Sequence, residues 1–118
     1  VTRTIEFLLS KDPGHAPMNP TQSWMDRINT AQMECGRHRW QALDALHDYD
    51  IAANLQKVER PILLLIGEHF HYLQYRDEFH ARNKRLRSEV IAGARLCMGW
   101  ERAVDIGGHV RAFLREAA

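Results

Sequence analysis

The apolar positions in the first third of the chain recur with the period of a helix. Residues 2–10 carry an apolar stripe at helical spacing, and residues 11–20 contain three prolines and a glycine, which are typical of a loop. Thr21 can cap a second helix that Gly36 ends. This part of the chain is therefore predicted to form two helices joined by a loop.

The same period continues in shorter segments up to residue 55. A third helical segment is expected at residues 39–47, and Asp50 can cap a further turn that runs through Leu55. No strand pattern occurs before this point. Residues 1–50 are therefore predicted to contain only helices and loops.

The pattern changes at Pro61–Ile66, where a proline is followed by five branched aliphatic residues and then by Gly67. A strand with this sequence has no polar face, so both of its faces must be covered. Strands covered on both faces are typical of a parallel sheet that lies between helices. The run predicts an α/β fold.

The rest of the chain alternates helix and strand. Residues 71–83 are predicted to be helical, Ser88–Ala92 a shorter strand, and Trp100–Ala117 the last helix. We interpret Gly107–Gly108, inside that helix, as a kink or a point of close packing. A helix between two strands fits a right-handed parallel crossover.

Two parallel strands are too few to bury the aliphatic run of Pro61–Ile66. A two-stranded sheet has open edges and is marginal by itself. We therefore expect the chain to form a homo-oligomer that completes the sheet, to need a missing N-terminal part of the same protein, or to rebuild its core as a mostly helical homodimer.

Composition narrows the classes of partner. The 118 residues are 45% hydrophobic and 26% charged, with a formal net charge of +1, so no bulk charge favours nucleic acid or a membrane surface. The basic run at residues 82–87 is interpreted as a solvated helix end. No apolar run is long enough to span a bilayer. We expect no nucleic-acid partner and no membrane partner.

Cysteine and histidine residues suggest no metal or disulfide framework. Cys35 and Cys97 are far apart in a chain without Cys-x-x-Cys, which favours free thiols in a reducing, cytoplasmic setting. His69, His71 and His80 could supply imidazole ligands, but they are interpreted as loop and surface residues. We expect no metal and no cofactor. The chain starts at valine, so it could be a processed or truncated piece.

Three segments in the second half resemble a known family. Residues 58–68 (VERPILLLIGE) resemble the penultimate strand of the α/β-hydrolase fold, residues 90–97 (VIAGARLC) its last strand and following loop, and residues 100–114 its closing helix. The resemblance implies that residues 1–50 are a helical cap-like segment. It also implies that residues 51–118 are the C-terminal strand-helix-strand-helix of the domain, incomplete without the preceding strands.

The resemblance also implies positions for a catalytic triad, and this chain departs from them. Phe70 stands where the family carries the acid, and Leu96 stands where it carries the histidine. The nucleophile elbow, Gly-x-Ser-x-Gly, is absent. Leucine cannot accept a proton and phenylalanine cannot orient an imidazole, so this chain alone is not expected to perform triad hydrolysis.

Nearby residues are candidates for a remnant site. A shift of register would put Glu68 in the acid role beside His69, but we interpret Glu68 as a solvated loop carboxylate. Cys97 adjoins the histidine position and is interpreted as a packed thiol. If a ligand pocket exists, the expected lining is Trp24, Trp40, Phe70 and Leu96, with Trp100 as a further aromatic candidate.

The sequence therefore supports two interpretations. The first is an α/β-hydrolase-like protein or fragment with a degenerate triad, whose pocket binds a small-molecule ligand or supports a non-hydrolytic reaction. The second is a small, mostly helical binding or oligomerisation module without catalysis.

Overall fold

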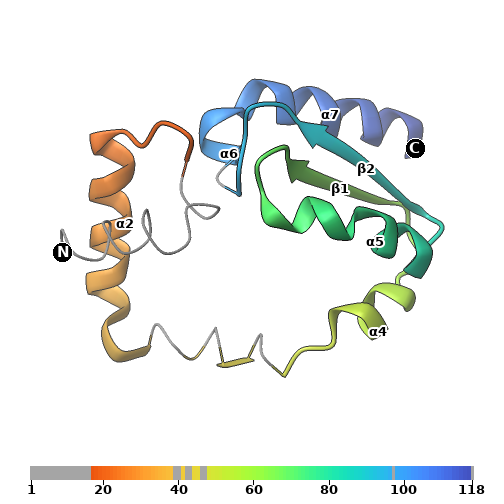
Figure 1. The fold of residues 1–118 in the computed structure, drawn as a ribbon, viewed down its shortest axis with the longest axis horizontal. Helices are drawn as coiled ribbons and strands as arrows, with labels where there is room; N and C mark the ends of the chain where they lie inside the picture. Colours follow the sequence, from red (N-terminus) through yellow and green to blue (C-terminus); the bar gives the residue numbers. More distant parts are fainter. Residues whose placement is uncertain (1–16, 39–40, 42–43, 46–47, 97, 118) are drawn as a thin grey trace.

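The computed structural model describes residues 17–38, 41, 44–45, 48–96 and 98–117. Its first part contains α2 (Gln22–Cys35), the 3-10 helix η2 (Gly36–His38) and α4 (Ile51–Gln56). Its second part contains β1 (Ile62–Gly67), η3 (His71–Tyr75), α5 (Arg76–Arg82), β2 (Leu86–Ile91), α6 (Met98–Glu101) and α7 (Ala103–Ala117). Figure 1 shows the second part gathered around the strands, with α2 standing apart from them.

The predicted helix caps are confirmed. The Thr21 hydroxyl oxygen accepts the Trp24 N–H at 3.2 Å and so begins α2, and Gly36 follows its last residue with a φ of 51°. The Asp50 carboxylate accepts the Ala53 N–H at 2.9 Å and begins α4. These polar side chains satisfy main-chain donors that have no partner inside the helix.

Two predicted helices fall partly or wholly outside the described residues. The helix expected at residues 2–10 lies outside them. Of the segment expected at 39–47, residues 41, 44 and 45 are described, and they are helical.

The two strands pair in parallel, with Ile62 opposite Leu86 and Gly67 opposite Ile91. The predicted α/β class is therefore confirmed in its general form, a small parallel sheet with helices. β1 is one residue later than the predicted Pro61–Ile66. β2 begins two residues before the predicted Ser88, because the alternating side chains of Leu86, Arg87 and Ser88 fit a strand whose two faces differ.

One helix packs on each face of the sheet. Residues paired across a parallel ladder point to the same face. The Ser88 side chain bonds to α5, and the Arg87 side chain pairs with Glu116 of α7. The even-numbered strand residues therefore lie under α5 and the odd-numbered ones under α7.

The helices after β1 and β2 are each divided. The predicted helix at 71–83 consists of η3 and then α5, and the predicted helix at Trp100–Ala117 is interrupted at Arg102, between α6 and α7. The interruption does not fall at Gly107–Gly108, through which α7 continues. The interpretation of the glycine pair as a kink or a point of close packing therefore stays a prediction.

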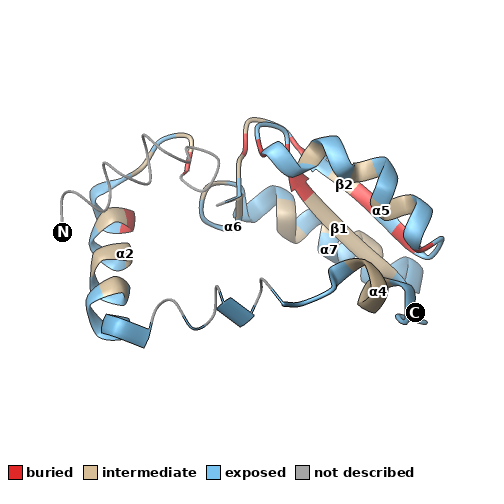
Figure 2. Ribbon diagram, turned by 60° about the horizontal axis from the view of Figure 1, so that its bottom comes forward, coloured by how far each residue is buried: buried red, intermediate tan, exposed pale blue. Residues whose placement is uncertain are grey.

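The core is small. Among the described residues, the buried apolar side chains are Trp24, Ile66, Phe70, Leu86, Ile91 and Ala94. The first four residues of β1, Ile62 to Leu65, are only half-buried (Figure 2). No residue of α7 is buried. The helices of one chain therefore cover the aliphatic strand incompletely, as the sequence predicts.

Asn83 joins the amino ends of both strands. Its side-chain amide donates to the Leu55 and Val58 carbonyls at 2.8 and 2.9 Å, and its side-chain oxygen accepts the Arg85 N–H at 2.9 Å. The residue is buried. Every polar atom of the side chain therefore has a partner, which is the condition for burying it without penalty.

In the part of the chain that the structure describes, none of the helices combines the length and the apolar character needed to cross a membrane.

Candidate functional site

The carboxyl ends of β1 and β2 meet at one edge of the sheet, where ligands bind in open α/β folds. The loops that follow the two strands are tied together there. The Glu68 N–H donates to the Ile91 carbonyl at 3.0 Å, and the His69 N–H donates to the Ala94 carbonyl at 2.9 Å. The two loops therefore form a single unit.

Gly67 is needed for this close approach. A Cβ atom at that position would collide with the carbonyl oxygens of Ala94 and Arg95. Since those atoms belong to the main chain, no rotamer change can relieve the overlap. The glycine that closes the aliphatic run thus fixes the distance between the two loops.

The structure brings the two predicted residues of a remnant site together. The Glu68 carboxylate accepts the Gly93 N–H at 2.7 Å, and the same oxygen lies 3.6 Å from His69 Nε2. That distance suits an ion pair but exceeds a hydrogen bond. Each side chain is 49% exposed. Glu68 can therefore attract a protonated His69, while solvent and ligands reach both groups.

Phe70 and Leu96, which the resemblance would place at the acid and histidine positions, carry no group that can act as an acid or a base. Phe70 is 7% exposed, and its ring lies 4.6 Å from the His71 ring and 4.9 Å from the Tyr72 ring, centroid to centroid. Leu96 is 43% exposed in the loop after β2. An apolar ring packed under the loop cannot replace an acid, so the geometry of a triad is not present at these two positions.

The described members of the expected ligand-pocket lining lie in different surroundings. Trp24 is buried in α2, and Trp40 lies outside the described residues. Phe70 is packed against neighbouring rings, and Leu96 is exposed. The third tryptophan, Trp100, does line a hollow beside the two loops.

We refer to this feature as the Gly93 hollow, a space of about 270 Å³ next to the loop after β2. The residues that line it are Met18, Asn19, Thr21, Gly93, Trp100, Glu101 and Arg102. The Glu101 carboxylate accepts the N–H groups of Met18 and Asn19, each at 2.8 Å, and so holds the segment before α2 against α6. Both oxygens of Glu101 therefore already accept hydrogen bonds.

Arg102 is a charged side chain of the Gly93 hollow that has no ion-pair partner among the described residues. Its guanidinium lies so close to Gly93 that a Cβ atom there would be 2.6 Å from one of its nitrogens. Gly93 also has a φ of 64°, which disfavours side chains. Arg102 forms no ion pair with any described residue. No sequence motif marks it, so sequence reasoning could not find it.

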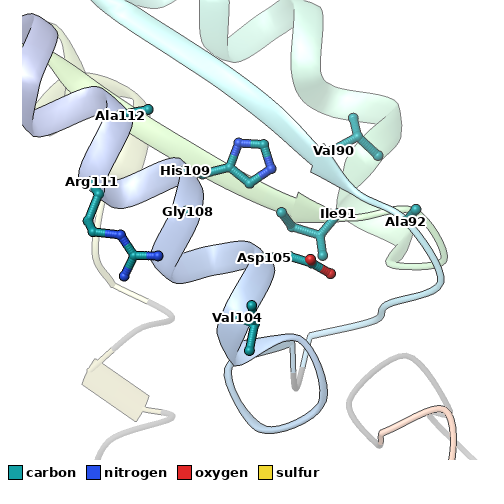
Figure 3. A pocket seen from close by; sticks show the side chains of 9 residues that line it. All are labelled: Val90, Ile91, Ala92, Val104, Asp105, Gly108, His109, Arg111 and Ala112. Atoms are coloured by element: carbon teal, nitrogen blue, oxygen red, sulfur yellow. The ribbon is translucent and has the colours of Figure 1, made fainter.

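A second hollow, of about 640 Å³, lies between the end of β2 and α7 (Figure 3). Asp105 and His109, one helical turn apart, both point from α7 toward β2, beside Val90 and Ile91. Val104 at its margin is 83% exposed. This open groove contains none of the predicted site residues.

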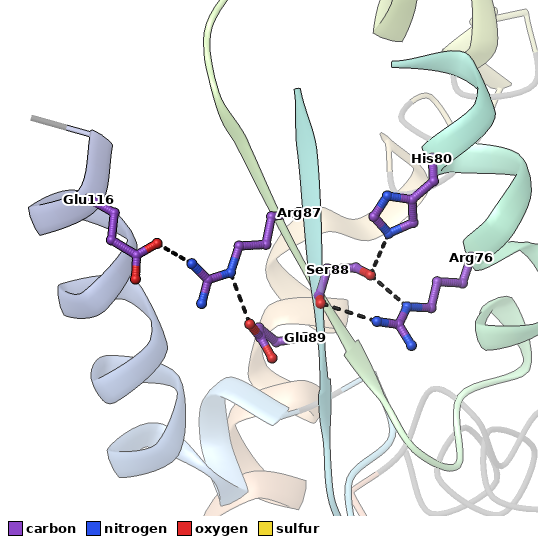
Figure 4. A network of polar contacts seen from close by, with 6 residues as sticks. All are labelled: Arg76, His80, Arg87, Ser88, Glu89 and Glu116. Atoms are coloured by element: carbon purple, nitrogen blue, oxygen red, sulfur yellow. Dashed lines mark hydrogen bonds and ion pairs between the residues drawn. The ribbon is translucent and has the colours of Figure 1, made fainter. Parts of the chain in front are cut away.

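Ser88 and His80 form a pair that resembles a nucleophile and its base (Figure 4). The Ser88 hydroxyl lies 2.7 Å from His80 Nε2 and accepts Arg76 Nε–H at 2.6 Å. Ser88, however, is buried in the middle of β2 rather than exposed on an elbow. The contacts instead attach α5 to the sheet.

Within the described residues, no three histidine, cysteine or acidic side chains are grouped as metal ligands. His80 bonds to β2, whereas His69 is on the loop after β1. Comparison with protein-family models, with curated proteins and with solved structures found no match to this chain.

Proposed function

We propose that this chain is part of an α/β-hydrolase-like protein that binds a small carboxylate ligand at the carboxyl end of its sheet and does not perform triad hydrolysis. The proposal is supported by Phe70 and Leu96, which stand where the resemblance implies a catalytic acid and histidine. The two loops at these positions are still held together and still carry accessible polar groups.

Charge at the Gly93 hollow supports an anionic ligand. Both carboxylate oxygens of Glu101 already accept main-chain N–H groups, whereas Arg102 has no carboxylate partner among the described residues. An arginine fork binds a carboxylate with two parallel hydrogen bonds. The indole of Trp100 offers an apolar surface next to it for the rest of a small molecule.

The ligand test is a titration with acetate and benzoate, followed by two-dimensional amide and indole NMR. We expect shifts at Gly93, Trp100 and Arg102, and their loss in Arg102→Met. Lys84→Met, which removes an exposed cation from the turn before β2, is the matched control and should bind as the wild type does. Equal binding by Arg102→Met and the wild type would contradict the assignment.

The reaction test is an ester-hydrolysis assay of the wild type and Glu68→Gln. Both are expected to stay at the uncatalysed rate, because neither chain has a triad. Hydrolysis that disappears in Glu68→Gln would instead show that Glu68 and His69 act as an acid-base pair, and the non-hydrolytic proposal would fail.

The proposed setting is a reducing cytoplasm, since Cys35 is a free, exposed thiol. The alternative, a binding or oligomerisation module without catalysis, is favoured by one observation, the half-exposed aliphatic strand β1. The two proposals differ in the surface they use, the carboxyl-end loops for the first and the strand for the second.

A further inference from the structure

One edge of β1 has no hydrogen-bonding partner in the part of the chain that the structure describes. The Ile62 N–H donates to the Arg85 carbonyl at 3.1 Å and the Glu68 N–H to the Ile91 carbonyl at 3.0 Å. Alternate residues of a strand bond to the same neighbour, so the even-numbered residues of β1 bond to β2. Leu63 and Leu65 therefore direct their N–H and C=O groups to the opposite edge, where no described residue bonds to them.

The outer edge of β2 is protected differently. By the same alternation, Ser88 directs its main chain away from β1, and there its carbonyl accepts Arg76 Nη2–H at 3.3 Å. A charged side chain across an edge prevents the addition of a further strand. β1 has no such side chain, so the structure favours extension of the sheet on the β1 side only.

We infer that two copies of this chain pair through β1, antiparallel and edge to edge, about a twofold axis at Leu64. In this arrangement Leu63 of one copy lies opposite Leu65 of the other, and the reverse pair is equivalent. Each pair exchanges two main-chain hydrogen bonds. The result is a four-stranded sheet, with the two blocked β2 strands at its outer edges.

The ends of β1 select this register. It places Pro61, which has no N–H, opposite Gly67, whose carbonyl already accepts the Phe70 N–H at 3.0 Å. An axis at Leu63 would leave the Leu65 carbonyl facing the proline. An axis at Leu65 would direct the Leu63 N–H toward the occupied Gly67 carbonyl. Only the axis at Leu64 avoids both losses.

Charge complementarity points to a second copy as the partner. The same register places Arg60 of one copy opposite Glu68 of the other, and the twofold axis repeats the pair. Opposite charges directly across antiparallel strands are favourable. Arg60 is exposed and forms no ion pair with any described residue. The edge is thus complementary to itself in hydrogen bonding and in charge.

A cysteine at the axis tests the register. Residues that face each other without hydrogen bonds in antiparallel strands have Cα atoms about 4.5 Å apart, which suits a disulfide. In a Cys35→Ser, Cys97→Ser background, Leu64→Cys should therefore crosslink two chains on oxidation. Ile62→Cys is the matched control: it is equally half-buried and on the same face, but its two copies would lie about 14 Å apart.

The outcomes are decisive. Dimers from Leu64→Cys and monomers from Ile62→Cys support the proposal. Equal crosslinking of both, or crosslinking of Ile62→Cys alone, overturns it. Circular dichroism of each variant confirms that the fold is retained.

Sedimentation equilibrium of the unmodified chain is the second test. We expect a dimer at micromolar concentration, weakened about tenfold by Arg60→Glu, because two favourable pairs become repulsive. Lys84→Glu, with the same charge change away from the edge, should not alter it. A folded monomer throughout, or equal weakening by both variants, overturns the proposal. Because no variant in these experiments changes the Gly93 hollow, a failure here would leave the ligand titration unaffected.

Discussion

The two strands of this protein lie side by side, and each has six residues, yet the fold treats them differently. β1, with the sequence ILLLIG, has no polar side chain, and its first four residues remain half-exposed. β2, with the sequence LRSEVI, carries Arg87, Ser88 and Glu89, all of which bond to other groups. The strand with the more apolar sequence is therefore the one whose side chains the rest of the chain covers less completely.

This difference shows that apolar side chains and polar side chains contribute to the fold in different ways. The aliphatic side chains of β1 favour burial but do not specify what covers them, because the hydrophobic effect is non-directional. Ser88 of β2 bonds to Arg76 and His80 of α5 and so helps to determine where that helix lies, whereas Arg87 pairs with Glu89 and Glu116 at the surface. We interpret β2 as an edge strand that accepts no further strand, and β1 as a strand whose second neighbour is a strand of another chain.

Asn83→Ala should produce the largest change, because it detaches the amino ends of both strands. The substitution removes three hydrogen bonds, which takes the side-chain donor from the Val58 carbonyl and the acceptor from the Arg85 N–H, while the Leu55 carbonyl keeps the Val58 N–H. We expect a loss of about 2–4 kcal/mol in the free energy of unfolding. Urea denaturation followed by circular dichroism measures it.

Asn54→Ala is the matched control for that experiment. Asn54 donates to the Asp50 carbonyl at 2.8 Å on the exposed side of α4, where water can replace the bond. We expect a loss of about 0.5 kcal/mol or less. Similar losses at the two positions would show that burial of the Asn83 amide does not matter.

Ser88→Ala should produce an intermediate change in the attachment of α5 to β2. The Ser88 hydroxyl is shared by Arg76 and His80, and both would lose a partner in a partly buried site. We expect a loss of about 1–2 kcal/mol. Thr30→Ala, on the exposed side of α2, is the control.

A double-mutant cycle with Arg76→Met identifies the cause. If the bond between Arg76 and Ser88 carries the stability, the double variant should lose less than the sum of the two single losses. Additive losses would mean that the two residues contribute independently and that α5 is held by other contacts.

Local signals in the sequence predicted much of this fold. Thr21, Gly36 and Asp50 mark helix ends through chemistry that involves only neighbouring residues, and the structure confirms each. The run before Gly67 predicts a strand covered on both faces, because its five aliphatic residues include no polar side chain. The start of β2 was harder to predict, because Arg85 and Arg87 in the basic run suggested a helix end. The alternating burial of Leu86, Arg87 and Ser88 in the folded chain shows that the strand begins at Leu86.

The candidate site was less predictable than the fold. Glu68 and His69 could be named because they are adjacent to a recognisable loop. The role of Arg102 depends on its distance from Gly93, which no spacing in the sequence reveals. The resemblance directs attention to these loops, but the charge available to a ligand is a property of the folded molecule.

Arg87→Met should produce the smallest effect, and it tests the odd-numbered face of β2. Arg87 pairs with Glu89 at 3.0 Å and also with Glu116 of α7. The hydrogen bond to Glu89 and the charge of Glu116 raise the pKa of Arg87 above its ordinary value, so the guanidinium stays charged at any working pH.

Exposed pairs of this kind contribute little, since water solvates the separated charges almost as well. We therefore expect a melting temperature close to that of the wild type, both at low salt and in 0.5 M sodium chloride, where remaining surface attraction is screened to within about 5 Å. A clear drop in the melting temperature at low salt would show instead that α7 depends on this pair, and that its packing on the sheet contributes less than the structure suggests.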